Sequence, residues 1–255
     1  MLSKNQIKEI QSLHLKKQRD NQKLFIVEGV KSVSEVLLQK SELVSKVYAT
    51  KEFLSNYNKK LQQYKIDNLE ITEGELQKIS LQNNPNQVFA LCNYFSDTSS
   101  AFDFNKDFTI YMDDIRDPGN FGTIVRLADW FGIKNVFCSP ASCDFYNPKV
   151  IQATMGAFLR VNVVYSELDT LLKQHSIDNV YGAVLNGANI YNNKLSNGLI
   201  IIGNEANGIS DANLKLINKP ITIPSHQNNG TESLNAAMAT SIIVSEFYRQ
   251  LKTSA

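Results

Sequence analysis

Cysteine and histidine are scarce in this sequence, and their spacing argues against the common metal and disulfide frameworks. Three cysteines occur in 255 residues with no Cys-x-x-Cys pair, and the three histidines are scattered. A zinc site needs a cluster of such ligands, so we expect no metal. The first residues, "MLSKNQIKEIQSLHLKKQRD", also lack an apolar signal-peptide core. An odd cysteine count without such a core favours a reducing cytoplasm.

Long hydrophobic runs and a strong excess of charge are missing as well. No apolar run reaches the length of about 18 residues that a transmembrane helix requires. The formal net charge is +1, so the chain as a whole is not a basic surface for nucleic acid. Hydrophobic residues make up 43 % of the chain, which is enough to bury the core of one large domain or two modest ones.

Positive charge is nevertheless concentrated near the N-terminus. From Met1 to Lys31 there are seven basic residues and three acidic ones, and most of the basic residues lie in "HLKKQRDNQK". A basic loop can neutralise phosphates and release counterions, which would make this segment an RNA contact. A solvated, lysine-rich surface loop is the alternative. Charge alone leaves both interpretations open.

The periodicity of the chain predicts two α/β units. Short strands and helices alternate up to about Asn93, and the polar segment "SDTSSAFDFNKD" that follows has the composition of a linker. A second alternating series begins at Phe108 and ends in a long helix from about Glu232 to Leu251. Alternating βα units favour a parallel sheet with helices on both faces. We therefore expect domains at 1–95 and 107–255, joined by a linker at 96–106.

The stretch "YMDDIRDPGNFGTIVRLADWFGI", Tyr111 to Ile133, follows a predicted strand and opens a helix. A glycine-rich turn in this position usually binds a dinucleotide, but the G-x-G-x-x-G pattern is absent. The turn carries Asn120, and Arg126 follows in the helix. Asp144 lies too far past the next strand for the ribose-binding acid. A dinucleotide oxidoreductase is therefore disfavoured.

The glycine-rich segments come late in the chain instead. "LIIIGNEANGIS" is an apolar strand that ends in a tight loop, and "ITIPSHQNNGTESLNAAMATSII" is a strand, a polar loop and a helix start with small residues. Glycine allows the backbone to approach a ligand closely. Either loop by itself is equally typical of an ordinary connection in an α/β fold.

Together, these three segments resemble the ordered motifs of the SpoU (TrmH-type) branch of the SPOUT RNA methyltransferases. The resemblance covers about residues 106–252, and "KVIQATMGAFLRV" also matches the segment that links the motifs. The N-terminal segment "QSLHLKKQRDNQKLFIVEGVKSVSEVL" resembles the accessory substrate-binding domain of many members, an RNA-binding fold akin to one found in ribosomal proteins. Three motifs in this order and spacing are far more specific than any one of them.

The resemblance implies a parallel-sheet α/β domain whose C-terminal part forms a deep trefoil knot that binds S-adenosylmethionine. It also implies methyl transfer to a ribose 2′-hydroxyl of ribosomal or transfer RNA, and a homodimer packed through the C-terminal helix. The residues that match fall into three groups. The catalytic candidates are Asn120, Arg126, Glu205, Ser233 and Asn235; the cofactor candidates are Leu185, Gly203, Asn204, Glu205, Ile223 and Leu234; the RNA candidates are Lys16, Lys17, Arg19 and Lys23.

One departure from the family pattern falls in the second motif, where Ala206 replaces a glycine and could restrict the backbone. Two other functions remain open on the same scaffold: methylation of a different RNA atom, and RNA binding after loss of catalysis. The retention of all five catalytic candidates argues against the second. The sequence does not indicate which RNA or which nucleotide is the target.

Overall fold

The structure is a computed structural model that describes residues 1–96, 102–226 and 233–252. It divides into two compact units, one of Met1–Thr98 with Asp144–Leu159 and one of Ser99–Cys143 with Arg160–Ala255. The sequence-based boundaries place residues 144–159 in the second domain, whereas their contacts group them with the first unit. Part of the expected linker, residues 97–101, lies outside the described residues.

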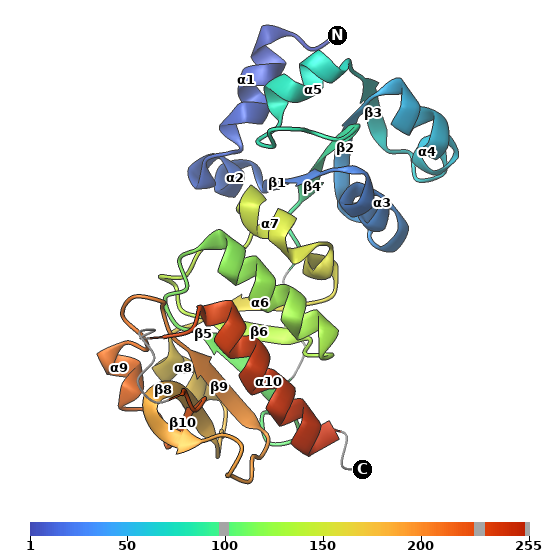
Figure 1. The fold of residues 1–255 in the computed structure, drawn as a ribbon. Coiled ribbons are helices and arrows are strands. Elements are labelled where there is room, and N and C mark those ends of the chain that lie inside the picture. The colour runs from blue at the N-terminus through green and yellow to red at the C-terminus, as the bar shows by residue number, and fades with distance from the viewer. Residues whose placement is uncertain (97–101, 227–232, 253–255) are drawn as a thin grey trace. The chain divides into compact units, whose positions relative to one another are not determined.

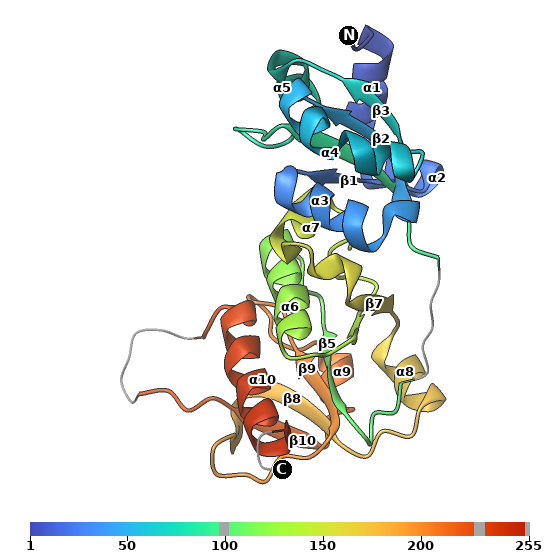
Figure 2. The same cartoon turned by 90° about the vertical axis from the view of Figure 1, so that its right-hand side faces the viewer.

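The sheet of the first unit has four strands, drawn in Figures 1 and 2. These are β1 (Leu24–Glu28), β2 (Val44–Ala49), β3 (Asp67–Glu70) and β4 (Val88–Asn93), in the order β1-β4-β2-β3. Strand β4 runs antiparallel to both of its neighbours, and β2 runs parallel to β3. The alternation of strands and helices predicted in this part of the chain is confirmed, but the sheet is mixed.

Helices cover both faces of this sheet. On one face, α1 (Lys4–Ser12) and α5 (Glu73–Ile79) share a core with the strands, and both begin with a capping box that satisfies backbone N–H groups. Successive strand residues point to opposite faces, so the other face is left for α3 (Val30–Gln39) and α4 (Lys51–Gln63), which pack on each other and on the strands.

The first unit contains two further helices, α2 (Lys16–Gln22) and α7 (Pro148–Thr154), and α2 was not expected from the sequence. The basic segment that we interpreted as a loop forms α2, a seven-residue helix without apolar periodicity. Helix α7, in the segment that links the motifs, packs against β1. Short 3₁₀ turns occur at Ser41–Leu43 and Ala157–Leu159.

The second unit contains a six-stranded sheet in the order β10-β8-β9-β5-β6-β7, and every pairing in it is parallel. This confirms the predicted α/β class. Strands β5 and β9 lie in the middle and are buried along their whole length. The strand bounds are β5 (Phe108–Met112), β6 (Asn135–Cys138), β7 (Asn162–Tyr165), β8 (Val180–Asn189), β9 (Gly198–Ile202) and β10 (Lys219–Thr222).

The described residues of this unit also form the helices α6 (Pro118–Trp130), α8 (Leu168–Gln174), α9 (Asp211–Leu214) and α10 (Ala236–Lys252). Helices α6 and α10 pack side by side (Figure 1), while α8 contributes to a core on the opposite face. Glu232, the expected start of the last helix, lies outside the described residues. The trefoil knot remains a prediction that rests on the family resemblance.

The order of the strands fixes the position of a site. The chain passes from β5 to β6 on one side, and β9 pairs with β5 on the other. In parallel sheets, such a reversal leaves a crevice at the carboxyl ends of the strands, where ligands bind. The predicted site residues after β5, β9 and β10 follow the carboxyl ends of three strands of this one sheet.

Candidate active site

The turn after β5 is fastened to the loop after β9. The Asp113 backbone N–H donates to the Ile202 carbonyl at 2.8 Å, and its carboxylate accepts the Ser210 N–H at 2.8 Å. Asp113 is only 3 % exposed. Asp114 has a left-handed backbone with φ of 56°, which is rare for a residue with a side chain. The paired aspartates therefore shape the junction between two motifs and hold it rigid.

The loop after β9 closes on itself. The backbones of Asn204 and Gly208 exchange two hydrogen bonds of 2.9 and 2.8 Å. The Asn204 side chain accepts the N–H groups of Ala206 and Asn207 and donates to the Asp114 carbonyl at 2.8 Å. Its side-chain amide and its backbone are therefore both occupied in holding the loop.

Glycine is required at the start of this loop but not in its middle. A Cβ atom at Gly203 would lie 2.2 Å from the carbonyl carbon of Gly208, closer than real Cβ contacts allow. Ala206 is not among the described residues with a positive φ, so the replacement of the family glycine causes no backbone strain there.

One asparagine connects the three motifs. The Asn120 side chain donates to the Glu205 carboxylate and accepts the Asn235 side-chain N–H at 2.9 Å. Helix α6 holds Asn120 in place because Asp117 caps the helix and accepts the Asn120 N–H at 2.7 Å. Asn235 in turn accepts the N–H groups of Ala237 and Met238 at the start of α10. Residues 115 positions apart in the chain thus form a single polar cluster.

The other two catalytic candidates are not part of this cluster. Arg126 is exposed, and no hydrogen bond or ion pair joins its guanidinium to any residue that the structure describes. It follows Asn120 by six residues, which in an α-helix means about 9 Å along the axis and a different face. Ser233 is exposed beside the cluster residue Asn235 in the chain. Arg126 is therefore free to contact a ligand or another chain.

The cofactor candidates lie at three adjacent strands. The partner of β10 shifts from Gly182 to Ala188, so residues 183–187 of β8 have no partner residue in β10. The Thr222 hydroxyl donates to the Leu185 carbonyl at 3.1 Å, which places Leu185 close to the end of β10 and Ile223. The Leu185 side chain is 72 % exposed and that of Leu234 is 42 % exposed.

These residues fit S-adenosylmethionine. Exposed apolar side chains beside polar loops suit an adenine ring, because its faces are apolar and its edge forms hydrogen bonds. The loop of Gly203 to Glu205 follows β9, the strand next to β8. Among the residues described, no group of three or more His, Cys, Asp or Glu side chains could hold a metal ion.

The basic residues in and just after α2 differ in their exposure to solvent. Arg19 is 2 % exposed, and its guanidinium donates to the carbonyls of Leu13 and His14 and to the Asp144 carboxylate at 2.6 Å. This burial means that Arg19 stabilises the first unit and does not face RNA, contrary to the prediction. Lys16 forms an exposed ion pair with Asp20, and Lys17 and Lys23 are exposed.

Sequence reasoning also missed exposed apolar residues on the helices of the second unit. Trp130 at the end of α6 is 84 % exposed, and Met238 on α10 is exposed as well. Trp130 is the single tryptophan of the chain, and this rarity was the only feature of the sequence that could have drawn attention to it.

No helix among the described residues is both long enough and apolar enough to cross a membrane.

Comparisons with known proteins agree with this geometry. Residues 107–245 match the SpoU rRNA Methylase family, and residues 4–90 match the MRM3-like substrate binding domain. The chain is 28 % identical over 250 residues to the Bacillus subtilis 23S rRNA (guanosine(2553)-2′-O)-methyltransferase RlmP, a match that covers 95 % of this chain and 96 % of that protein.

Solved structures give the same result. A protein assigned to the TrmH family of RNA methyltransferases from Porphyromonas gingivalis is 34 % identical, with a TM-score of 0.82 and coverage of 98 % of this chain and 99 % of that one. AviRb from Streptomyces viridochromogenes, solved with AdoMet, has the same fold with a TM-score of 0.83 at 21 % identity, over 97 % of this chain and 98 % of that one. The matched family covers more than half of the chain, including all three motifs, and the chain therefore belongs to the SpoU rRNA methylase family.

Proposed function

We propose that this protein is an S-adenosylmethionine-dependent RNA methyltransferase that methylates a ribose 2′-hydroxyl of ribosomal RNA. The observation that carries the proposal is the cluster of Asn120, Glu205 and Asn235, which brings together the three family motifs beside the cofactor loops. Its relatives support the substrate, since the Bacillus subtilis protein is named for 2′-O-methylation of 23S rRNA. An RNA-binding protein without catalysis would have no need to keep this cluster.

Methyl transfer to a ribose 2′-hydroxyl requires that the hydroxyl be positioned and that the charge developing on its oxygen be stabilised. S-adenosylmethionine supplies an electrophilic methyl group when it is bound. A ribose 2′-hydroxyl has a high pKa, so the protein must orient the oxygen and stabilise the negative charge that develops as its proton leaves. The amides of Asn120 and Asn235 can orient the ribose, because they are fixed by each other and by Glu205. The exposed Ser233 lies two residues before Asn235 in the chain, at this end of α10.

Arg126 supplies the positive charge. Its guanidinium has no partner among the described residues and can bind a phosphate with two parallel hydrogen bonds. A phosphate bound there would hold the nucleotide in place and assist removal of the 2′-hydroxyl proton. Because Arg126 stands apart from the Asn120 cluster on α6, it acts on the RNA and not on the cofactor.

The protein acts as a homodimer through α10 and the start of α6. Helices α6 and α10 pack together and leave Met238, in the first turn of α10, exposed, although large apolar side chains are usually buried. A second copy would cover this surface and would place the site near the interface, where Arg126 can serve either chain. A sedimentation mass near 28.7 kDa at micromolar concentration would contradict the dimer.

The first unit binds structured RNA, in keeping with its match to a substrate binding domain. The exposed lysines Lys16, Lys17 and Lys23 bind phosphates of the RNA backbone. We propose that the protein meets this substrate in the cytoplasm. Each lysine that is changed to alanine should reduce the salt dependence of RNA binding, by roughly 0.7–0.9 in slope for each phosphate that is no longer neutralised. An unchanged slope would assign RNA recognition to the second unit.

A direct test uses ribosomal RNA transcribed in vitro, purified protein and S-adenosylmethionine with an isotopically labelled methyl group. After digestion to nucleosides, the label should appear in a 2′-O-methylated nucleoside. Label in a base-methylated nucleoside would favour the alternative target atom. Absence of label from RNA, with the cofactor bound, would favour the protein without catalysis.

A further inference from the structure

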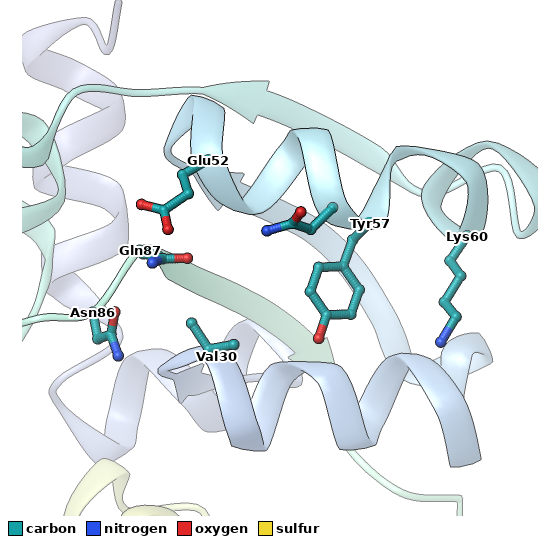
Figure 3. Close-up of a pocket in the computed structure, with 7 residues that line it drawn as sticks. Val30, Glu52, Tyr57, Lys60, Asn86 and Gln87 are labelled. Carbon is teal, nitrogen blue, oxygen red and sulfur yellow. The ribbon is translucent and has the colours of Figure 1, made fainter.

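A pocket of about 630 Å³ lies within the first unit, away from the basic helix α2. Figure 3 shows Glu52, Tyr57 and Lys60 projecting from α4 toward α3, and Val30 at the start of α3 facing them. Asn86 and Gln87, on the segment that enters β4, close one end. Asn56 on α4 completes the lining. The volume is in the range of small-ligand sites, which are usually about 300–1,000 Å³.

The lining of this pocket is built by the helical repeat. Glu52, Asn56 and Lys60 are spaced four residues apart, so they share one face of α4. Tyr57 stacks on the buried Phe53 with ring centroids 4.4 Å apart and planes at 13°. That contact fixes the Tyr57 ring, and Lys60 lies 5.8 Å from its centroid. The pocket therefore presents a fixed aromatic ring next to a row of polar groups.

Four polar side chains of the pocket form no hydrogen bond with the residues that the structure describes. They are those of Glu52, Asn56, Asn86 and Gln87. Gln87 also has a left-handed backbone with φ of 57°, held by the hydrogen bond of 2.8 Å from the Thr50 N–H to its carbonyl. Such strained residues occur preferentially at binding sites. The pocket thus combines free donors and acceptors with a rigid frame.

We propose that this pocket binds one unstacked guanine nucleotide of the RNA substrate. The inference rests on the proposed function, because it takes structured RNA as the ligand. Guanine stacks on Tyr57, its adjacent N1–H and N2–H groups donate to the Glu52 carboxylate, and its O6 and N7 atoms accept from the amides of Asn56 and Gln87. Sequence-specific recognition of RNA commonly uses bases that are splayed out in this way and stacked on aromatic side chains.

The charges of the pocket lining favour a nucleobase over a phosphate group as the ligand. One carboxylate and one ammonium group face the pocket, so its lining has no excess of positive charge for a phosphate or a nucleoside triphosphate. The amides make it unsuitable for an apolar ligand, since their hydrogen bonds to water would be lost without replacement. Of the standard bases, guanine alone presents the paired N–H donors that match a carboxylate. The lysines of α2 would then position the RNA while the pocket reads a base.

The first test measures binding of the full-length protein to ribosomal RNA transcribed in vitro, by filter binding at fixed salt. Tyr57→Ala should weaken binding by about 5- to 150-fold, the range for loss of one base–aromatic stack. Tyr57→Phe should bind like the wild type because it keeps the ring. Asn56→Ala should weaken binding by about 2- to 12-fold, the range for one hydrogen bond.

Matched controls separate the pocket from general effects on charge and helix stability. Asn58→Ala changes an exposed asparagine on the same helix that does not line the pocket, and it should leave binding unchanged. Glu52→Gln should weaken binding, whereas Glu73→Gln, which removes an exposed carboxylate from the first turn of α5, should not. S-adenosylmethionine affinity should stay at the wild-type value in every variant. Equal effects of Asn56→Ala and Asn58→Ala would overturn the proposal.

The second test identifies the base. Transcripts that contain 6-thioguanosine or 4-thiouridine are irradiated with the wild-type protein, and the adducts are mapped by mass spectrometry. A 6-thioguanosine adduct in the peptide of residues 52–59 supports the proposal. An adduct there from 4-thiouridine alone, or none from either, overturns it. Wild-type protein that methylates ribosomal RNA without any pocket adduct would refute only the pocket, whereas failure to bind ribosomal RNA at all would also refute the proposed function.

Discussion

The polar cluster at the candidate active site predicts a measurable coupling between distant residues. Asn120→Ala removes two side-chain interactions at once, one with the Glu205 carboxylate and one with the Asn235 amide. Hydrogen bonds to charged groups contribute about 1.5–3 kcal/mol and neutral ones about 0.5–1.5 kcal/mol. Asn120 is half-buried, so water replaces part of each interaction and the lower ends of these ranges apply. We expect a loss of about 2 kcal/mol, or about 30-fold in the single-turnover rate of methyl transfer.

A double-mutant cycle tests whether this loss arises from the cluster. If Asn120 and Asn235 act together, the Asn120→Ala and Asn235→Ala substitutions should be non-additive by at least about 0.5 kcal/mol in the activation free energy, derived from single-turnover rates with saturating cofactor and RNA. Asn207→Ala is the matched control, because Asn207 is exposed in the loop of Glu205 and its side chain forms no hydrogen bond with any other described residue. Additive effects, or an equal loss in the control, would refute the view that these motifs form one catalytic unit.

Three further outcomes are expected. Arg126→Ala should lower the single-turnover rate about 100-fold or more without changing S-adenosylmethionine affinity, and Arg126→Lys should restore little because a point charge cannot replace the planar guanidinium; a wild-type rate would remove Arg126 from the mechanism. Gly203→Arg should abolish cofactor binding in calorimetry, since even a Cβ would collide with Gly208, whereas Gly74→Arg, where a Cβ meets nothing within 4 Å, should bind normally; unchanged affinity in a folded Gly203→Arg variant would contradict the cofactor site. Burial raises the pKa of the Glu28 carboxyl above its ordinary value of 4.5, although two hydrogen bonds act in the opposite direction. The ionised carboxylate therefore destabilises the folded state once the pH rises above about 4.5. Glu28→Gln should raise the melting temperature at pH 7 but not at pH 4, and an equal change at both pH values would contradict this pKa shift.

Elements with strong periodicity could be predicted from the sequence. The strand "FTIYM" and the helix after it were expected, although Pro118 and Gly119 were interpreted as part of a turn and the helix was expected only from residue 120. Asp117 instead caps the helix and Pro118 is its first residue, which is typical of a helix start. The parallel sheet followed from the alternation of strands and helices. The motifs also predicted that Asn120, Glu205 and Asn235 belong to one site, and the structure brings these three side chains into contact.

Features that depend on distant contacts could not be predicted. Arg19 has the same sequence context as its neighbouring lysines, and only the position of Asp144, 125 residues away, explains its burial. Helix α2 has no apolar face to mark it, so its basic residues suggested a loop. The register shift between β8 and β10, which skips residues 183–187, depends on the pairing of the two strands, and periodicity does not encode it. The pocket beside Tyr57 combines three segments that carry no distinctive motif in the sequence.

The central claim is that this chain methylates a ribose 2′-hydroxyl in ribosomal RNA. The most direct measurement is a mass-spectrometric map of ribose methylation in ribosomal RNA from cells that carry this gene, from cells that lack it, and from cells with the Asn120→Ala variant. The account predicts that one 2′-O-methylated nucleotide disappears with the gene and is depleted in the variant. Identical maps of ribosomal RNA, or a missing methyl group that lies on a base, would contradict it.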